Sequence, residues 1–329
     1  MENVVQLFKD FESVKVGVIG DVMLDTYLWG GVERISPEAP VPIVSVTKKE
    51  QRIGGAGNVA LNIQSLGAQA YVISVMGDDD DASCLTQLFA DNNIKTDYSL
   101  KSRHRITTNK TRIISRNQQM MRLDAEQTND LTEADSENLL RNFRAFVETE
   151  SPHIVILEDY NKGVLTETII KEVIAICKDA NVLTAVDPKR RNFFSYDGVD
   201  IFKPNLKEVK EALNILFTDT QLPLLQEIHQ ALHQQLRHHI SLITLSEKGV
   251  FYQHGESANI IASHIRNVAD VSGAGDTVIA VAALVYAVRK NVHLMAEIAN
   301  IAGGLVCEEV GTAAISKLAL LHECELLLS

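Results

Sequence analysis

Short apolar runs rich in β-branched residues alternate with helical patterns along most of this 329-residue chain. The runs lie at 14–20, 70–77, 153–159, 182–187 and 241–246. Helical spacing of apolar residues occurs near 56–67, 82–92, 132–149, 165–178, 205–215, 223–238, 274–289 and 293–308. Strands that are apolar throughout are typical of a parallel sheet covered on both faces. The order therefore predicts an α/β fold, with a doubly wound, mostly parallel sheet flanked by helices.

Two segments interrupt this alternation. Residues 26–47 hold three of the seven prolines and alternate polar with apolar side chains. Residues 96–124 have the pattern of antiparallel strands, with the SRNQQ segment at 115–119 as a hairpin tip. We predict that both segments form a small β-sheet lid over one edge of the main sheet, within a single domain spanning residues 1–329.

Charge and composition exclude several classes of protein. The formal net charge of −12 argues against a nucleic-acid partner, which needs a basic face. No apolar run reaches the length of a membrane span, and the N-terminal residues lack the pattern of a signal peptide. The four cysteines have no metal-ligand spacing and are expected to be reduced thiols. We therefore expect a cytoplasmic protein with no membrane partner.

The segment DVSGAGDT, residues 270–277, stands where a long helix begins. The first N–H groups of a helix lack intrahelical partners and attract anions, and glycines allow close approach of a ligand. Gly273, Ala274 and Gly275 could therefore form an anion hole, beside which Asp276 could accept a proton from an attacking hydroxyl. That arrangement suits phosphoryl transfer. The alternative is an ordinary helix cap.

A second glycine cluster, Gly54, Gly55 and Gly57, precedes a helix that is expected to begin near Asn58. It lies too far from the first strand to be a dinucleotide-binding fingerprint. A sugar site with backbone N–H groups and Asn58 is one interpretation, and a tight turn is the other. Asp21 and Asp25 follow the first strand, where they could accept sugar hydroxyls or stabilise a turn.

The segment KPNLKEVKEAL, residues 203–213, opens a helix with Asn205 and Glu208. Asparagine at an N-cap with glutamate three residues later is a capping-box pattern. The same pair could face a magnesium ion through water, because hard oxygen ligands suit Mg²⁺. Both interpretations stay open at this point.

In order along the chain, GDVMLD, GGAGNVA, DPK, KPNLKE and DVSGAGDT resemble the ribokinase-like, or PfkB, family of carbohydrate kinases. The resemblance covers nearly the whole chain and implies a ribokinase-like fold. Within that family the chain is most similar to kinases that phosphorylate D-glycero-D-manno-heptose 7-phosphate at C1. The stretches that carry this finer resemblance include RISPEAPVP, SRNQQ and LEDYNKGVL.

The resemblance implies a role for each matched residue. Asp276 would be the general base, and Gly273, Ala274 and Gly275 the anion hole. Sugar contacts would come from Asp25, Gly54, Gly55 and Asn58, and ATP contacts from Lys189, Asn205, Glu208, Ser246, Gly249 and Asn300. Asn205 and Glu208 would organise Mg²⁺ through water. Asp270 and Ser272 match positions that hold a monovalent cation such as K⁺ in relatives, although cation dependence varies across the family.

Basic residues gather on the expected lid of this acidic chain, at Lys110, Arg112, Arg116 and Arg122. A substrate that carries a 7-phosphate needs such cations. Arg112, Arg116, Arg122 and Lys162 are therefore candidates for phosphate binding, with Arg116 at the hairpin tip as first choice. For each of them, a solvated surface charge is the alternative.

The implied activity is ATP-dependent formation of the heptose 1,7-bisphosphate, as in the synthesis of ADP-heptose for lipopolysaccharide. The chain lacks the nucleotidyltransferase motif that many bacterial relatives carry, so we expect only the kinase step. A kinase of another sugar or sugar phosphate, such as a ketohexose, is the alternative, and a non-catalytic sugar-binding protein is a minor one. A homodimer through the lid is expected, because the unpaired backbone groups at an open sheet edge can pair with another chain.

Overall fold

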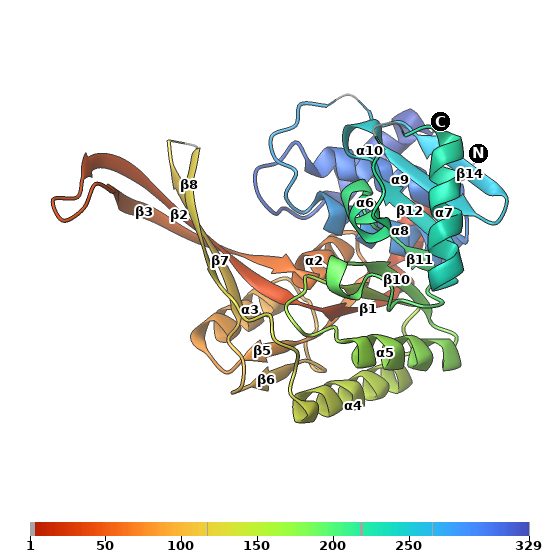
Figure 1. Ribbon diagram of the computed structural model, residues 1–329, viewed down its shortest axis with the longest axis horizontal. Coiled ribbons are helices and arrows are strands. Elements are labelled where there is room, and N and C mark those ends of the chain that lie inside the picture. The colour runs from red at the N-terminus through yellow and green to blue at the C-terminus, as the bar shows by residue number, and fades with distance from the viewer. Residues whose placement is uncertain (1–3, 117, 218–219, 265, 329) are drawn as a thin grey trace.

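The computed structural model describes residues 4–116, 118–217, 220–264 and 266–328 (Figure 1). Its main sheet has the strand order β14-β13-β12-β11-β10-β9-β1-β4. The strands from β12 to β4 pair in parallel, whereas β13 and β14 are antiparallel additions at one edge. The strand bounds are β1 (Lys15–Gly20), β4 (Gln69–Ile73), β9 (Ile154–Glu158), β10 (Leu183–Asp187), β11 (Ile201–Phe202), β12 (Ile240–Thr244), β13 (Val250–His254) and β14 (Ser257–Ile261).

Helices cover both faces of this sheet, because each parallel strand sends alternate side chains to opposite sides. Val16 and Val18 of β1 belong to one core cluster, for example, and Ile19 to the other. The first cluster is covered by α1 (Val4–Asp10), α2 (Ala56–Ser65), α3 (Asp80–Asp91), α8 (Ala274–Arg289), α9 (Val292–Val306) and α10 (Lys317–Leu327). The second is covered by α4 (Glu133–Glu150), α5 (Glu167–Asp179), α6 (Leu206–Leu213) and α7 (Leu222–Leu236). The doubly wound α/β architecture expected from the sequence is confirmed.

The lid is a separate four-stranded sheet in the order β3-β2-β7-β8, and it extends away from the main body (Figure 1). Its strands are β2 (Val22–Ile35), β3 (Pro42–Gly55), β7 (Thr108–Ser115) and β8 (Gln118–Ala125). The strands β2 and β3 are longer than the segment 26–47 and run directly from β1 into α2.

Three details of the expected lid differ in the structure. The strands β2 and β7 pair in parallel, so the lid is not purely antiparallel. Residues 96–107 lie outside its sheet, and part of them forms β6 (Leu100–Ser102), which pairs with β5 (Val75–Gly77). The helix α2 begins at Ala56 rather than near Asn58, because β3 ends at Gly55. Residue 117, in the expected hairpin tip, lies outside the described residues.

The chain reverses its direction of winding at β1, which lies between β4 and β9 although both follow it in sequence. Ligands of open α/β sheets bind at the carboxyl ends of the strands at such a switch point. In register, Gly20 pairs with Glu158, and Glu158 pairs with Asp187. The ends of β1, β9 and β10 therefore meet at one place.

Asp21, directly after β1, stabilises this switch point. Its buried carboxylate accepts three backbone N–H hydrogen bonds from the loop after β9, from Tyr160 at 2.9 Å, Lys162 at 3.0 Å and Val164 at 3.1 Å. Of the two interpretations, the turn-stabilising one fits Asp21. None of the described helices is both long enough and apolar enough to cross a membrane.

Asp21→Asn should lower the free energy of unfolding by about 2–4 kcal/mol, because its amide group would meet backbone donors in a buried site. Urea unfolding of the two proteins measures this difference. Asp78→Asn is the matched control, since Asp78 pairs with Arg103 at the surface and exposed pairs contribute about 0–1 kcal/mol. Equal effects of the two substitutions would contradict the anchoring role of Asp21.

Candidate active site

Asp276 lies in the first turn of α8 and is 4% exposed. The helix is preceded by Gly273 at φ +79°, a left-handed conformation that favours glycine. A Cβ atom at Gly273 would also lie 2.7 Å from Nδ2 of Asn58. Glycine at this position therefore lets α8 begin close against α2, with Ala274 and Gly275 as its first residues.

Two neutral donors hold the Asp276 carboxylate, one on each oxygen. Nδ2 of Asn58, on α2, donates to Oδ2 at 2.7 Å, and the hydroxyl of Tyr160 donates to Oδ1 at 2.7 Å. Burial raises the pKa of Asp276 to about 6, against the lowering effect of these two hydrogen bonds. A carboxyl group with that pKa is ionised at neutral pH and is a stronger base than an exposed aspartate.

Glu158 and Asp187 lie beside Asp276 at the ends of β9 and β10, and the three carboxyl groups approach within 4.8 Å of one another. The buried ammonium of Lys203 pairs with Asp187 at 2.7 Å. Burial and the neighbouring carboxylates raise the pKa of Glu158 well above its usual range. The Lys203 ammonium offsets part of the negative charge of the three carboxyl groups.

Lys189 joins that cluster to the start of α6. Its ammonium lies 3.2 Å from Asp187 and 2.8 Å from Oε1 of Glu208. Burial opposes its charge, but the carboxylates of Asp187 and Glu208 outweigh burial and raise the pKa of Lys189. Asn205 and Glu208 form a complete capping box on α6, so the structural interpretation of this pair is realised. Each Glu208 oxygen can accept a second hydrogen bond, which leaves contact with a metal-bound water available.

Asp25 and Gly54 meet at the base of the lid. The Asp25 carboxylate is 2% exposed and accepts a hydrogen bond from Arg112 at 2.5 Å. Its other oxygen would lie 2.5 Å from a Cβ atom at Gly54, so glycine there makes room for the carboxylate. The neighbouring Gly55, at φ +60°, ends β3 and forms the N-cap of α2.

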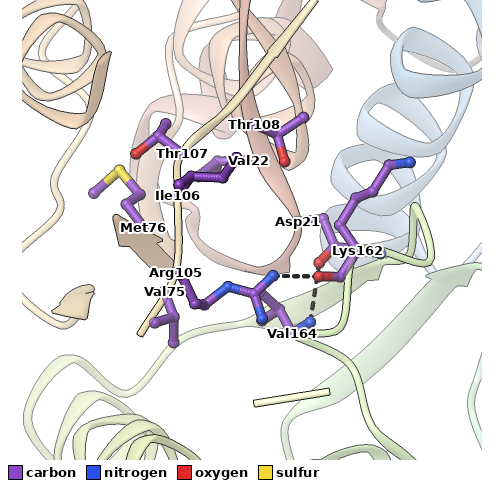
Figure 2. A pocket seen from close by; sticks show the side chains of 10 residues that line it. All are labelled: Asp21, Val22, Val75, Met76, Arg105, Ile106, Thr107, Thr108, Lys162 and Val164. Atoms are coloured by element: carbon purple, nitrogen blue, oxygen red, sulfur yellow. Dashed lines mark hydrogen bonds between the residues drawn. The ribbon is translucent and has the colours of Figure 1, made fainter. Parts of the chain in front are cut away.

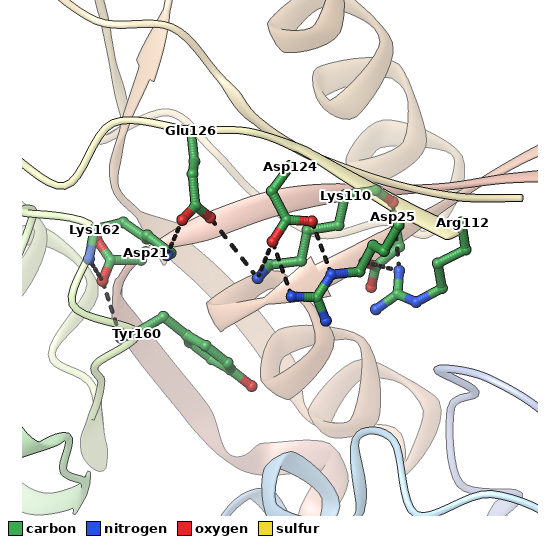
Figure 3. Close-up of polar contacts among 9 residues, drawn as sticks. Asp21, Asp25, Lys110, Arg112, Asp124, Glu126, Tyr160 and Lys162 are labelled. Atoms are coloured by element: carbon green, nitrogen blue, oxygen red, sulfur yellow. Dashed lines mark hydrogen bonds and ion pairs between the residues drawn. The ribbon is translucent and has the colours of Figure 1, made fainter. Parts of the chain in front are cut away.

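A row of alternating charges crosses from the lid to the main body (Figure 3). Lys162 donates to Glu126 at 2.7 Å, and Lys110 lies 3.8 Å from Glu126 and 3.9 Å from Asp124. Asp124 in turn accepts two hydrogen bonds from Arg122, at 2.8 and 2.9 Å. Together with Arg112, four cations stand around Asp25, Asp124 and Glu126.

Arg116 is not part of this row. It is exposed in the turn between β7 and β8, at the outer end of the lid (Figure 1). Lys110 pairs with Asp25 in register, so Arg116 lies six residues further along, about 20 Å away at the usual rise of a strand. The structure thus pairs Arg112 with Asp25, places Arg122 and Lys162 in the same row of charges through Asp124 and Glu126, and leaves Arg116 outside that row.

A small pocket lies beside the row of charges, and the basic side chains that line it in the described part of the chain are already engaged in contacts within the protein (Figure 2). Arg105 and Lys162 both line it, but the Arg105 guanidinium donates to the backbone carbonyls of Asn129 and Lys162. These contacts stabilise the loops that flank the switch point.

Three residues that were expected to contact ATP lie away from the ends of β1, β9 and β10, at the turn after β12 and on α9. Ser246 and Gly249 bound the turn between β12 and β13, where Gly249 has φ +99°. Asn300 on α9 donates to the carbonyl of Ala262 at 2.8 Å and so holds the segment after β14. The structure tests no nucleotide contact of these residues, which stay predictions.

Asp270 and Ser272 lie in the loop before α8. The Asp270 carboxylate accepts hydrogen bonds from the N–H and hydroxyl of Ser272, at 3.0 and 2.8 Å, and from the N–H of Gly311 at 2.9 Å. Asp270 therefore links two loops near the helix start. Their role toward a monovalent cation also stays a prediction.

No role was expected from the sequence for Tyr160, Glu158, Lys203, Asp124 or Glu126. A signal existed for Glu158 and Tyr160, since they stand at the end of the strand expected at 153–159 and just after it, where parallel sheets place functional side chains. Lys203 opens the segment 203–213, in which only Asn205 and Glu208 were singled out. Asp124 and Glu126 carried no such signal, because only the lid pairing places them among the cations.

The profile described as "pfkB family carbohydrate kinase" matches residues 14–318. The chain is 40% identical over 310 residues to "Bifunctional protein HldE" of Mesorhizobium japonicum (strain LMG 29417 / CECT 9101 / MAFF 303099), covering 93% of this chain and 61% of that protein. It is also 40% identical over 318 residues to "Bifunctional protein HldE" of Methylobacillus flagellatus (strain ATCC 51484 / DSM 6875 / VKM B-1610 / KT), covering 95% and 64%. The chain thus spans about three fifths of the length of these curated relatives.

Solved structures agree on the fold. Phosphofructokinase-2 from Escherichia coli in complex with substrates and products has a TM-score of 0.79 at 18% identity, covering 95% of this chain and 99% of that one. Ribokinase from Arabidopsis thaliana, complexed with ribose and ATP, has a TM-score of 0.72 at 19% identity, covering 94% and 98%. The ribokinase-like fold is confirmed, and the chain belongs to the PfkB family of ATP-dependent carbohydrate kinases.

Proposed function

We propose that this kinase transfers the γ-phosphoryl group of ATP to the C1 hydroxyl of D-glycero-D-manno-heptose 7-phosphate, giving the 1,7-bisphosphate. The observation that carries the chemistry is the buried carboxylate of Asp276 at the start of α8, with a pKa of about 6. The finer substrate assignment rests on the RISPEAPVP, SRNQQ and LEDYNKGVL stretches and on the cations at the lid base.

Asp276 is the proposed general base. As the C1 oxygen forms its bond to the γ-phosphorus, the bond from that phosphorus to the ADP oxygen breaks, and the hydroxyl proton passes to the Asp276 carboxylate. The N–H groups of Gly273, Ala274 and Gly275 at the start of the helix would stabilise the charge on the transferring group.

The row of charges at the lid base is the proposed phosphate site. Lys110, Arg112 and Lys162 are each largely buried and each pair with a carboxylate of Asp25 or Glu126. A substrate phosphate would accept hydrogen bonds from these cations in competition with the carboxylates of Asp25 and Glu126. Arginine suits this role because its fork matches phosphate oxygens.

ATP is expected to bind with Mg²⁺, which supplies charge neutralisation of the phosphates when bound. Asn205 and Glu208 would hold it through water, since their own oxygens are engaged in the capping box and by Lys189. Asp270 and Ser272 remain the proposed contacts for K⁺, and Ser246, Gly249 and Asn300 for the nucleotide.

A homodimer through the lid also stays a proposal. The strand β8 is exposed along its whole length, and its side chains include Met120, Met121 and Leu123. A second copy of the chain could cover this apolar strip.

Asp276→Asn should lower kcat by about 10²–10⁴-fold, the usual contribution of a positioned general base. Binding of ATP and of the sugar phosphate should persist, because the other contacts remain. A coupled ADP-release assay with heptose 7-phosphate measures turnover, and fructose 6-phosphate tests the alternative substrate. Turnover near that of the unchanged enzyme would exclude Asp276 as the base, and a preference for fructose 6-phosphate would exclude the heptose assignment.

The pH dependence of kcat/KM should report the ionisation of Asp276. Only ionised Asp276 can accept a proton, so kcat/KM should rise with pH and level off above the raised pKa of about 6. Rates measured between pH 4.5 and 8.5 in buffers of constant ionic strength provide the test. A profile that stays nearly flat down to pH 4.5, as the ordinary aspartate value of 3.8 would give, would contradict the role of burial.

Alanine at Arg112, Lys110 or Lys162 should reduce kcat/KM for the sugar phosphate by roughly ten- to 150-fold, and much less for the unphosphorylated sugar. The comparison of both substrates for each variant isolates the phosphate contact. Arg116→Ala is the matched control, because this exposed arginine should change neither value by more than about threefold. Equal losses on both substrates would show that the three cations only stabilise the fold.

A further inference from the structure

Tyr160 has no role in the proposed transfer, yet its hydroxyl lies 2.7 Å from Oδ1 of Asp276. We propose that Tyr160 is a positioning residue, which fixes and tunes the carboxylate of the general base through this hydrogen bond. The inference rests on the function proposed for Asp276. The loop after β9 would thus orient the carboxylate of Asp276, which neither the anion hole nor the lid contacts in this proposal.

Both the backbone and the ring of Tyr160 are held in place. Its N–H donates to the buried Asp21 carboxylate at 2.9 Å, which fixes the loop to the end of β1. The Lys189 ammonium lies 5.5 Å from the ring centroid, within the range of a cation–π contact. The hydroxyl therefore reaches Asp276 from an anchored side chain rather than from a mobile one.

Two hydrogen bonds, from Tyr160 to one oxygen and from Asn58 to the other, together fix the rotation of the Asp276 carboxylate. A carboxylate oxygen has two lone-pair positions, so each oxygen can still accept one further hydrogen bond. Two donors at 2.7 Å thus leave defined positions for the acceptor hydroxyl. Orientation of this kind contributes to rate because the reacting atoms meet in a narrow range of geometries.

Tyr160 also remains a donor at every working pH. Burial and the nearby carboxyl groups of Asp276 and Glu158 raise the pKa of the phenol well above its usual range. Its hydrogen bond lowers the pKa of Asp276, against burial and the charge of Asp187, while Lys203 lowers it too. Among the described residues, the ionisable groups near Asp276 include Glu158 on β9, Asp187 on β10, Lys203 after β11 and Lys189 against the Tyr160 ring, and α2 contributes the neutral Asn58.

Tyr160→Phe removes this hydroxyl and keeps the ring. The acid limb of kcat/KM should move upward by about one pH unit, because a hydrogen bond to the charged form is lost. At the plateau, kcat should fall about ten- to 100-fold while KM for the sugar phosphate changes by less than about threefold. A lowered KM with unchanged kcat would show that the hydroxyl merely occupies the position of the substrate, and would overturn the proposal.

Tyr196→Phe is the matched control. Tyr196 is a fully buried tyrosine whose hydroxyl donates to Asp159 at 2.8 Å, beside the same loop. It should lower the free energy of unfolding but leave the acid limb in place. An equal shift of the limb in both variants would reduce Tyr160 to a structural residue.

Carbon-13 NMR of the labelled aspartate carboxyl groups separates this inference from the proposed function. The Asp276 signal is identified by its loss in Asp276→Asn, and its titration is compared between the unchanged protein and Tyr160→Phe. An upward shift supports the coupling even if no sugar phosphate is turned over, in which case only the proposed function fails. An unmoved titration overturns the role of Tyr160.

Discussion

The arrangement of the candidate active site depends on Asp21, which joins the end of β1 to both segments that hold Asp276, the proposed general base. Its carboxylate binds the loop with Tyr160 and Lys162, and its carbonyl accepts the N–H of Ala56 at the start of α2 at 3.0 Å. Asn58 lies in the first turn of that helix. Because Tyr160 and Asn58 are the two donors on Asp276, one buried residue sets the positions of both.

Burial of several carboxyl groups at the strand ends is costly, and the fold offsets part of that cost in two ways. Lys203 and Lys189 pair with Asp187, and backbone N–H groups donate hydrogen bonds to Asp21. Burial raises the pKa of Glu158 well above its usual range, which favours the uncharged form. Asp276 receives hydrogen bonds from two neutral side chains, Asn58 and Tyr160. Burial raises the pKa of Asp276 to about 6, which suits a group that takes up a proton near neutral pH.

At the lid base, charged side chains are compensated by side chains of opposite charge. Its cations are paired with Asp25, Asp124 and Glu126, and these pairs link the lid strands to the loop after β9. Unpaired cations so close together would repel one another, so the acidic partners stabilise the ligand-free state. At this proposed phosphate site, a bound phosphate would exchange one set of charge-assisted contacts for another, and substrate binding would then be coupled to the position of the lid.

Much of the fold could be read from the chain without its structure. Apolar periodicity gave β1, β4, β9, β10 and β12 and the helices from α2 to α9 to within a few residues, as for the helix over 274–289, because each pattern is local. It did not give β11, β13 and β14, which complete the main sheet. The glycine clusters and the helix start at Asp276 were equally local. The lid was predicted less accurately, since the parallel pairing of β2 with β7 joins segments about 85 residues apart, and strand patterns do not specify a partner.

The sequence by itself therefore determined the doubly wound sheet, the family and the helix start that carries Asp276, the proposed base. Only the tertiary structure decided what surrounds that base. Tyr160 and Asp276 are 116 residues apart, and Asn58 and Asp276 are 218 apart. Their contacts exist because the ends of β1 and β9 and the starts of α2 and α8 meet at the switch point. The shift in the Asp276 pKa likewise arises from burial by distant segments, which no local pattern encodes.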